Sequence, residues 1–283
     1  IVTFFLEFIL ERLHLIPNNV LIRFIYQPAE EYVSGAQAMI KGGCMEGIDE
    51  IYGLHNMNIF ELGKIGLIEG PIMSSADLFK VHIKGTGGHG SMPHSSKNPI
   101  SAGVAMIPLI NQIPNQRINS ISRCTISVGS FNSGKAGNVV PEEAVFTGTY
   151  RTLDKETRKS LQEAIEEIVE YTAKAHGCTA KCTLDTGTLS AVNDPDLTRD
   201  IVYPALKETG LEITQSQLPF MGSEDFSYYQ EVTKGVFFFL GTGDKEHREQ
   251  LHSPYFDYND KATPMGVEAF VKIVEKRLSI SFK

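Results

Sequence analysis

The stretch FKVHIKG at residues 79–85 alternates apolar and polar side chains. A period of two is typical of a β-strand that buries one face and exposes the other to water. The patterns that follow predict a helix at 99–113, strands at 122–131 and 143–151, a helix at 155–176 and a strand at 178–184. The order β-α-β-β-α-β with one wet sheet face predicts a ferredoxin-like α+β domain over residues 77–186.

The two helices of this domain carry their own signals. Asp154 is predicted to cap the N-terminus of the second helix, and Gly177 to end it. The same helix is amphipathic, and its predicted buried stripe consists of Leu161, Ala164, Ile165, Ile168 and Val169. In the first helix Pro108 lacks a backbone N–H, so we expect a kink or an interruption there.

The segments on either side of this domain have a different character. VLIRFIY at 20–26 and the apolar run at 51–54 resemble strands, and the helix predicted at 34–41 ends at Gly42-Gly43. Strand, helix and strand in this order predict a parallel βαβ unit. After the domain, the patterns again predict alternating helices and strands: a helix at 196–208, a strand at 235–240 and a helix at 264–278. We therefore predict an α/β domain in two parts, residues 1–76 and 187–283, with residues 77–186 inserted between them.

Composition and charge exclude several classes of protein. Of the 283 residues, 42% are of the types AVILMFWYC and 21% are charged, which excludes a mainly disordered chain. The net charge of −8 gives no basis for binding nucleic acid or an anionic membrane. No apolar run approaches the roughly 18 to 20 residues of a membrane span. The four scattered cysteines make no disulfide framework, so a reducing, cytoplasmic setting is expected.

Two adjacent carboxylates follow the predicted strand 20–26, in the motif QPAEE that ends with Glu30 and Glu31. Ligands of open α/β sheets bind at the carboxyl ends of strands, so this pair is expected at an active-site edge. One carboxylate can bind a cation while the other handles a proton. The alternative is structural, since paired glutamates also suit the positive end of a helix dipole.

Two histidines are predicted to lie at the same edge of the sheet as Glu30 and Glu31. His55 ends the predicted strand at 51–54 and comes one helix-plus-strand crossover after Glu31, so the two are expected on neighbouring strands. His252 lies in a loop that follows the strand at 235–240. A glutamate and two histidines at three strand ends make a plausible ligand set for zinc or manganese. The alternative is three unrelated surface groups.

Two further motifs lie in the inserted domain. In TGGHGSMPH, glycines flank His89, whose imidazole is expected to project from a strand end; His94 is treated as surface or structural. Asn138 and Arg151 are predicted to lie across a turn on paired strands. The guanidinium group of Arg151 can bind a substrate carboxylate through two parallel hydrogen bonds, with the Asn138 amide beside it. Each residue alone would more often be turn chemistry or a surface charge.

Eight motifs in one order carry a family resemblance: QPAEE, GLHN, GGHGSMPH, GNVVPEEA, TYRT, GSEDFSYY, VFFFLGTG and LHSPYF. Together, over residues 20 to 270, they resemble the metal-dependent amidohydrolases that include hippurate hydrolases, N-acyl-amino-acid deacylases and auxin-conjugate hydrolases. The resemblance implies a metallopeptidase-like catalytic domain with an inserted dimerisation (lid) domain. It also implies hydrolysis of the amide bond of a small N-acyl amino acid by a homodimer that uses two divalent ions, zinc or manganese, per complete site.

The resemblance implies a role for each matched residue. Glu30 matches the general base that activates the attacking water. Glu31, His55 and His252 match metal ligands. His89 matches a histidine that reaches the active site of the opposite subunit and steadies the oxyanion.

The remaining matches concern the substrate. Asn138 and Arg151 match polar residues that meet it, Arg151 near its carboxylate. Glu224 and Asp225 match an acidic pair beside the site, to which the resemblance assigns no role.

One feature of the family is absent from the 283 residues. Family members supply further ligands from an upstream Cys-Gly-His-Asp-x-His segment, and nothing of this kind occurs here. The chain is therefore expected to be an N-terminally truncated member, in which three protein ligands cannot hold two ions. Two alternatives remain open: a dipeptidase or aminopeptidase of the same superfamily, and an inactive remnant that only dimerises.

Overall fold

The computed structural model describes residues 1–282, and the chain divides into two compact units. The first unit comprises residues 1–73, 191–220 and 224–283, and the second comprises residues 74–190 and 221–223. Within residues 1–282, no helix has the length and apolar character that crossing a bilayer requires. The four cysteines are free thiols.

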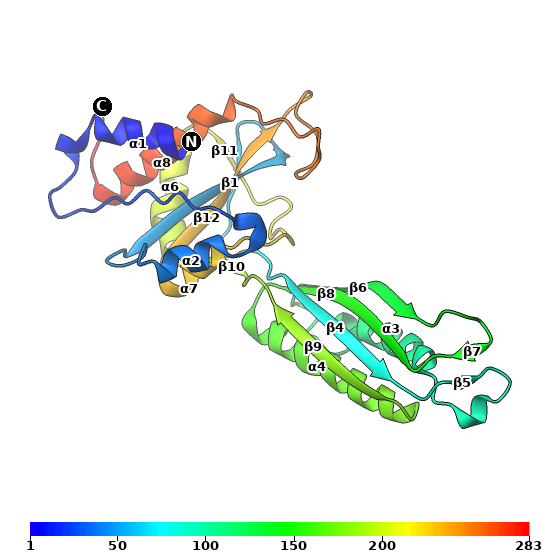
Figure 1. The fold of residues 1–283 in the computed structure, drawn as a ribbon. Helices are drawn as coiled ribbons and strands as arrows, with labels where there is room; N and C mark the ends of the chain where they lie inside the picture. Colours follow the sequence, from blue (N-terminus) through cyan, green and yellow to red (C-terminus); the bar gives the residue numbers. More distant parts are fainter. Residues whose placement is uncertain (283) are drawn as a thin grey trace. The chain divides into compact units, whose positions relative to one another are not determined.

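The first unit is built on a mixed four-stranded sheet in the order β1-β12-β2-β11 (Figure 1). These strands are β1 (Glu50–Glu61), β2 (Lys64–Gly66), β11 (Glu212–Thr214) and β12 (Lys234–Gly243). β1 runs parallel to β12, and β2 runs antiparallel to β12. A separate pair joins β3 (Gly70–Met73) to β10 (Ala191–Asn193).

Helices cover both faces of this sheet. Four of them are α1 (Val2–Leu10), α2 (Gly35–Lys41), α7 (Ser227–Val232) and α8 (Ala262–Leu278). A further helical segment is continuous from α5 (Pro195–Leu197) through a π-helical stretch (Thr198–Val202) to α6 (Tyr203–Lys207). Short 3₁₀ turns occur at Leu13–Leu15 and Glu30–Tyr32. The predicted helices at 34–41, 196–208 and 264–278 are confirmed.

β12 lies between two apolar cores. Val236, Phe238 and Leu240 pack with α1, α6 and α8, whereas Phe237 and Phe239 pack with α2 and α7. Since side chains alternate along a strand and both faces are covered, the strand is apolar almost throughout. His55 lies opposite Phe239 in the parallel register of β1 and β12, with the two rings 6.4 Å apart. The α2 and α7 side of the sheet therefore carries the histidine.

The predicted strand at 20–26 is wrong. Residues 20–29 belong to no strand, and the parallel neighbour of β1 is β12. Ile22 and Phe24 pack on one apolar core and Ile25 on the other, and Arg23 donates to the carbonyl oxygens of Cys44 and Glu46. A β-branched, aromatic sequence favours an extended chain, but a strand also needs a partner backbone. The predicted βαβ unit is therefore wrong as well.

The second unit has the predicted ferredoxin-like order. Its sheet runs β6-β8-β4-β9, and both helices pack on one face against the buried side of β4. The main elements are β4 (Asp77–Lys84), α3 (Pro99–Gln116), β6 (Cys124–Ser133), β8 (Glu143–Thr152), α4 (Lys155–Ala175) and β9 (Thr179–Thr186). β5 (Gly88–His89) and β7 (Val139–Val140) form a small separate pair, and Pro93–Ser95 is a 3₁₀ turn.

The local signals in this unit are mostly confirmed. β4 alternates buried and less buried residues, as FKVHIKG predicts. Asp154 caps α4 by accepting from the Thr157 N–H at 2.7 Å, and Gly177 follows the helix with φ of +69°. The predicted stripe of α4 is buried except for Ile168, which is partly buried. The expected interruption at Pro108 is wrong, because α3 continues through Pro108 and Pro114.

Candidate metal centre

Glu30 and Glu31 lie on the 3₁₀ turn Glu30–Tyr32, between two residues with unusual backbone conformations. Ala29 has φ of 57° and Val33 has φ of 54°, both in the left-handed region. For a non-glycine residue such a conformation costs on the order of 1–3 kcal/mol, and it persists only where the surroundings hold it. The turn that presents the two carboxylates is therefore held in place by other parts of the unit.

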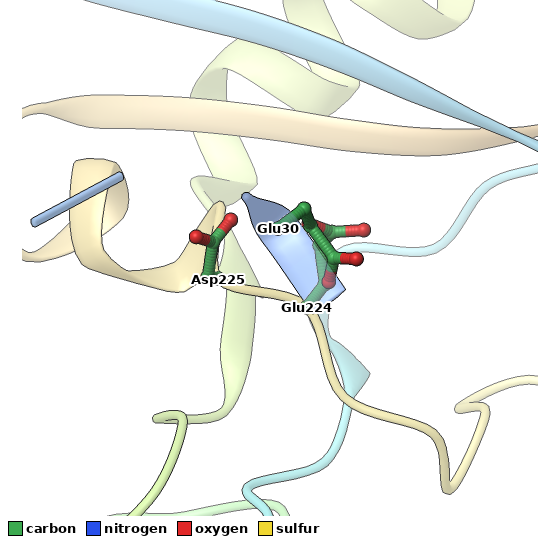
Figure 2. Close-up of side chains that lie close together, drawn as sticks. All are labelled: Glu30, Glu224 and Asp225. Carbon is green, nitrogen blue, oxygen red and sulfur yellow. The ribbon is translucent and has the colours of Figure 1, made fainter. Parts of the chain in front are cut away.

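Glu30 belongs to a cluster of three carboxyl groups with Glu224 and Asp225 (Figure 2). One ligand atom from each lies within 4.8 Å of the others, and Glu224 and Asp225 are buried. Burial and the charges of Glu30 and Asp225 raise the pKa of Glu224 to about 8. Burial and the charges of Glu31 and Asp225 also raise the pKa of Glu30. The hydrogen bond between the two side chains raises the pKa of Glu224 and lowers that of Glu30, so Glu224 is the member that holds a proton more readily and donates it to Glu30.

The raised pKa of Glu224 predicts how the stability of the metal-free protein depends on pH. A carboxyl group with a higher pKa in the folded state binds a proton that the unfolded state lacks between about pH 4.5 and pH 8. Its contribution to the free energy of unfolding is complete below this window and is lost as the pH rises through it. We expect urea denaturation at pH 5 and pH 8 to show this loss, and Glu224→Gln to reduce it. Glu69→Gln, at an exposed position, serves as the control, and an unchanged pH profile in Glu224→Gln would contradict the assignment.

Glu31 and His252 meet beside this cluster. The Oε1 atom of Glu31 lies 3.7 Å from Nδ1 of His252, and both side chains are largely exposed. His252 has φ of 66° and lies in the loop between β12 and α8. Two contacts to Asp244, at the start of this loop, hold it in place. Asn259 donates to the Asp244 carboxylate at 2.9 Å, and His247 pairs with the same carboxylate at 2.7 Å.

His55, the third predicted ligand, lies within β1 and not at a strand end, close enough to Glu31 and His252 for their charges to act on it. Among the described residues, the group that could hold a metal as the structure stands is Glu30, Glu224 and Asp225, and not these three.

The Nδ1 atom of His55 lies 2.5 Å from the carbonyl oxygen of Asn56, so the N–H is at Nδ1 and Nε2 keeps its lone pair. Burial lowers the pKa of His55, against the effect of Asn56 and the charge of Glu31, and His252 lowers it further. A neutral imidazole whose other nitrogen donates to a carbonyl is the usual form of a metal-binding histidine. Two imidazoles and a carboxylate fit a zinc or manganese ion.

His89 and Asn138 lie together in the second unit. His89 pairs with Val139 across β5 and β7, and the Gly90 N–H donates to the Asn138 carbonyl at 2.8 Å. A Cβ atom at Gly90 would come within 2.9 Å of that carbonyl oxygen, so the close approach requires glycine. The hydroxyl of Ser91 lies 2.7 Å from Nδ1 of His89, and the imidazole is exposed.

Arg151 does not lie beside Asn138, and the prediction that they occupy paired strands is wrong. β7 pairs with β5, whereas Arg151 is on β8 and faces Thr125 of β6. Asn138 lies shortly before the start of β8, and Arg151 lies near its end. Eight residue steps along the strand lead from Glu143 to Arg151, or about 26 Å. The Arg151 guanidinium donates to the Met221 carbonyl at 3.2 Å. One copy of this unit therefore does not bring both side chains to one small substrate.

Gln27 is a site residue that the sequence reasoning missed. Its amide donates to both oxygens of Asp225, at 2.8 and 2.9 Å. It directly precedes the proline of QPAEE, but a glutamine in a loop has no feature that marks a partner almost two hundred positions away. Only the fold shows the pair.

Comparison with known proteins identifies the second unit. Residues 75–177 match the model of the peptidase dimerisation domain of the M20 type. The chain is 32% identical over 252 residues to an N-acetylcysteine deacetylase of Bacillus subtilis, covering 89% of this chain and 65% of that protein. It is 30% identical over 260 residues to an IAA-amino acid hydrolase of Arabidopsis thaliana, covering 90% of this chain and 59% of that protein.

A solved structure gives the same result. The crystal structure of a dinuclear metal-binding peptidase of the M20 family from Bacillus subtilis superposes with a TM-score of 0.77 at 28% identity, over 91% of this chain and 65% of that one. The fold class predicted from the sequence is thereby confirmed. The chain spans about three fifths of the length of the curated relatives it matches.

Proposed function

The chain belongs to the M20 family of metal-dependent amidohydrolases and peptidases, and on this premise we propose that it hydrolyses the amide bond of N-acyl amino acids. The products are a free amino acid and a carboxylic acid. The observation that carries the proposal is the placement of Glu30. Its carboxylate has a raised pKa and directly precedes Glu31, which meets His252. A general base next to a carboxylate–imidazole donor set is the arrangement that metal-assisted amide hydrolysis requires.

In this proposal Glu31, His55 and His252 hold a divalent ion, zinc or manganese. The bound ion would supply Lewis-acid chemistry and lower the pKa of a coordinated water to about 7. Glu30 accepts a proton from the attacking water and returns it to the leaving amine. The hydrogen bond from Glu224 fixes the Glu30 carboxylate in one orientation.

The second unit supplies the groups that meet the substrate. Arg151 pairs with the carboxylate of the amino acid that leaves. His89, from the partner subunit, steadies the oxyanion. Because Asn138 lies with His89, and the strand from Glu143 to Arg151 is about 26 Å long, we assign Asn138 to the partner's contribution as well. The domain boundaries 1–76, 77–186 and 187–283 and a cytoplasmic location, where four free thiols stay reduced, are part of the same proposal.

A substrate panel tests the proposal. The full-length protein, loaded with zinc or manganese, is assayed on N-acetyl and N-benzoyl amino acids and on dipeptides with a free amine. We expect turnover of the acylated amino acids, loss of activity with a chelator, and recovery when metal is added back. A preference for dipeptides would favour the peptidase alternative. Stoichiometric metal without turnover of either class would favour a non-catalytic, dimerising protein.

We propose that the dimer forms along β6, one of the two edges of the second unit's sheet. β6 (CTISVGSFNS) carries no charged side chain, whereas the other edge, β9, carries Lys181 and Asp185. Charges on an edge strand discourage pairing with another chain, so β6 is the edge open to it. Exposed apolar side chains flank β6: Val104 and Leu109 on α3, and Ile121 just before the strand. Antiparallel pairing of β6 with its copy, about a two-fold axis perpendicular to the strands, would cover these side chains.

Ser127→Lys tests this interface. Ser127 is an exposed residue of β6, and in a dimer paired along this edge the new lysines would desolvate and repel each other. We expect the dissociation constant of the dimer, measured by sedimentation or light scattering, to rise by about tenfold or more. Thr183→Lys, on β9, is the matched control and should leave it unchanged. Equal weakening by both variants, or by neither, would argue against β6.

A further inference from the structure

Residues 27–36, which carry Glu30 and Glu31, form a segment that we call the strap. The carboxylate of Asp225 accepts hydrogen bonds from both of its ends. The Asp225 carboxylate accepts from the Gln27 side chain at 2.8 and 2.9 Å, and from the Ala36 N–H at 3.0 Å. Asp225 is 1% exposed, so these N–H groups replace the water that a carboxylate would otherwise bind. Gln27 and Ala36 stand at the two ends of the strap, and the catalytic pair lies between them.

Backbone bonds within the turn, such as that from the Val33 N–H to the Glu30 carbonyl at 2.7 Å, shape the middle of the strap but do not hold its two ends. Its 3₁₀ turn has no side-chain cap, and Ala29 and Val33 on either side have φ values that L-residues rarely adopt. The two ends also touch directly, since a Cβ atom at Gly35 would lie 1.8 Å from the carbonyl oxygen of Pro28. Such a turn relaxes unless its ends are held. Asp225 is the group that holds them.

The position of Asp225 near Glu30 and Glu224 also suits a third metal-binding carboxylate. Its hydrogen bonds argue otherwise. Both oxygens already receive N–H donors from the strap, and these three contacts take up most of the roughly four acceptor positions of a carboxylate. Figure 2 shows the Asp225 carboxyl group set apart from those of Glu30 and Glu224.

We propose that Asp225 is a positioning residue, which clamps the two ends of the strap and so sets where Glu30 and Glu31 point, and that it is not a metal ligand. The inference rests on the proposed function for the roles of Glu30 and Glu31. A misplacement of about 1 Å at a reacting group can cost on the order of a hundredfold in rate. The clamp acts through the strap and touches no substrate.

Exchanging the two clamp residues tests the proposal. Gln27→Glu removes the donor and places one carboxylate against another. Asp225→Asn keeps one oxygen acceptor but turns the other into an NH₂ donor, so the contacts to Gln27 and Ala36 can no longer all be made. In the double variant the new amide nitrogen at position 225 donates to the new carboxylate at position 27, and its oxygen still accepts from Ala36. The double variant also keeps the total charge. Gln27→Ala, which removes one anchor without adding a charge, is the milder single change.

Three measurements are made on the full-length protein: kcat and KM, zinc affinity by calorimetry, and amide hydrogen exchange of residues 28–36. We expect each single variant to lower kcat by about a hundredfold with a smaller change in KM, and to speed exchange in the strap. The double variant should recover at least tenfold of kcat and the slow exchange. Gln112→Glu, the same change on an exposed face of α3, is the control and should alter none of the three.

Two results would overturn the clamp. In the first, strap exchange in the single variants stays at the wild-type rate. In the second, Asp225→Asn abolishes zinc binding and the double variant restores neither zinc binding nor slow exchange, as expected if Asp225 were a ligand. Hydrogen exchange and zinc affinity test the role of Asp225 without any need for enzymatic activity. If the wild-type protein hydrolyses none of the acylated amino acids, that result counts against the proposed function and not against the role of Asp225.

Discussion

Glu30→Gln in the full-length protein is expected to lower kcat by about 10² to 10⁴ while the protein keeps its metal. The amide has the size of the carboxylate but accepts no proton at neutral pH, so the variant removes general-base catalysis without opening a cavity. The raised pKa of Glu30 brings its proton affinity closer to that of a working base at neutral pH. Steady-state kinetics on the best N-acyl amino acid, together with metal analysis of the purified variant, measure both parts.

Glu31→Gln is the matched control for that experiment. It makes the same chemical change one residue away and is expected to weaken metal binding, because Glu31 is the carboxylate that meets His252. Loss of metal in Glu30→Gln with retention in Glu31→Gln would show that the two roles are exchanged. A kcat near the wild-type value in Glu30→Gln would remove Glu30 as the base.

His252→Ala is expected to lower metal affinity by more than about 100-fold. Loss of a residue that merely orients a ligand typically costs 10- to 100-fold, and loss of a ligand should cost more. The imidazole is 72% exposed, so its removal should leave the thermal stability of the metal-free protein nearly unchanged. Calorimetric titration with zinc and a melting curve without metal separate the two effects.

His94→Ala provides the comparison for His252→Ala. His94 is also an exposed histidine, on the 3₁₀ turn Pro93–Ser95 of the second unit, and has no proposed role in metal binding. Its removal should change neither measurement. Unchanged zinc affinity in His252→Ala would mean that the loop between β12 and α8 does not supply a ligand.

The α4 helix and β4 show what could be predicted from local sequence. The cap at Asp154, the stop at Gly177 and the buried stripe of α4 depend on residues within one or two helical turns, and FKVHIKG depends only on alternation along one strand. The ferredoxin-like order followed from counting such elements. The segment 20–26 shows the limit: its residues favour a strand, but the ladder depends on a partner backbone, and β1 pairs with β12 instead.

For the candidate site too, some features could be predicted from the sequence and others depend on the fold. The sequence by itself determined which residue types are present in β1, in the loop after β12 and in QPAEE, and the motifs pointed to Glu30, Glu31, His55 and His252 as a set. The tertiary structure decided how these groups act on one another. Burial beside other carboxylates raises the pKa of Glu224 to about 8, and burial depends on the packing of distant segments.

Asp225 and Arg151 show most clearly what only the tertiary structure decided. Asp225 follows Glu224 in the chain, and the sequence suggested no role for it. Its partner Gln27 is 198 residues away and reaches it only because α2 and α7 pack on the same side of the sheet. Arg151 and Asn138 are 13 positions apart in sequence, yet the length of β8 separates them in space. Side-chain partners are set by strand register and helix packing, which are sums over many weak contacts, and no short motif records that sum.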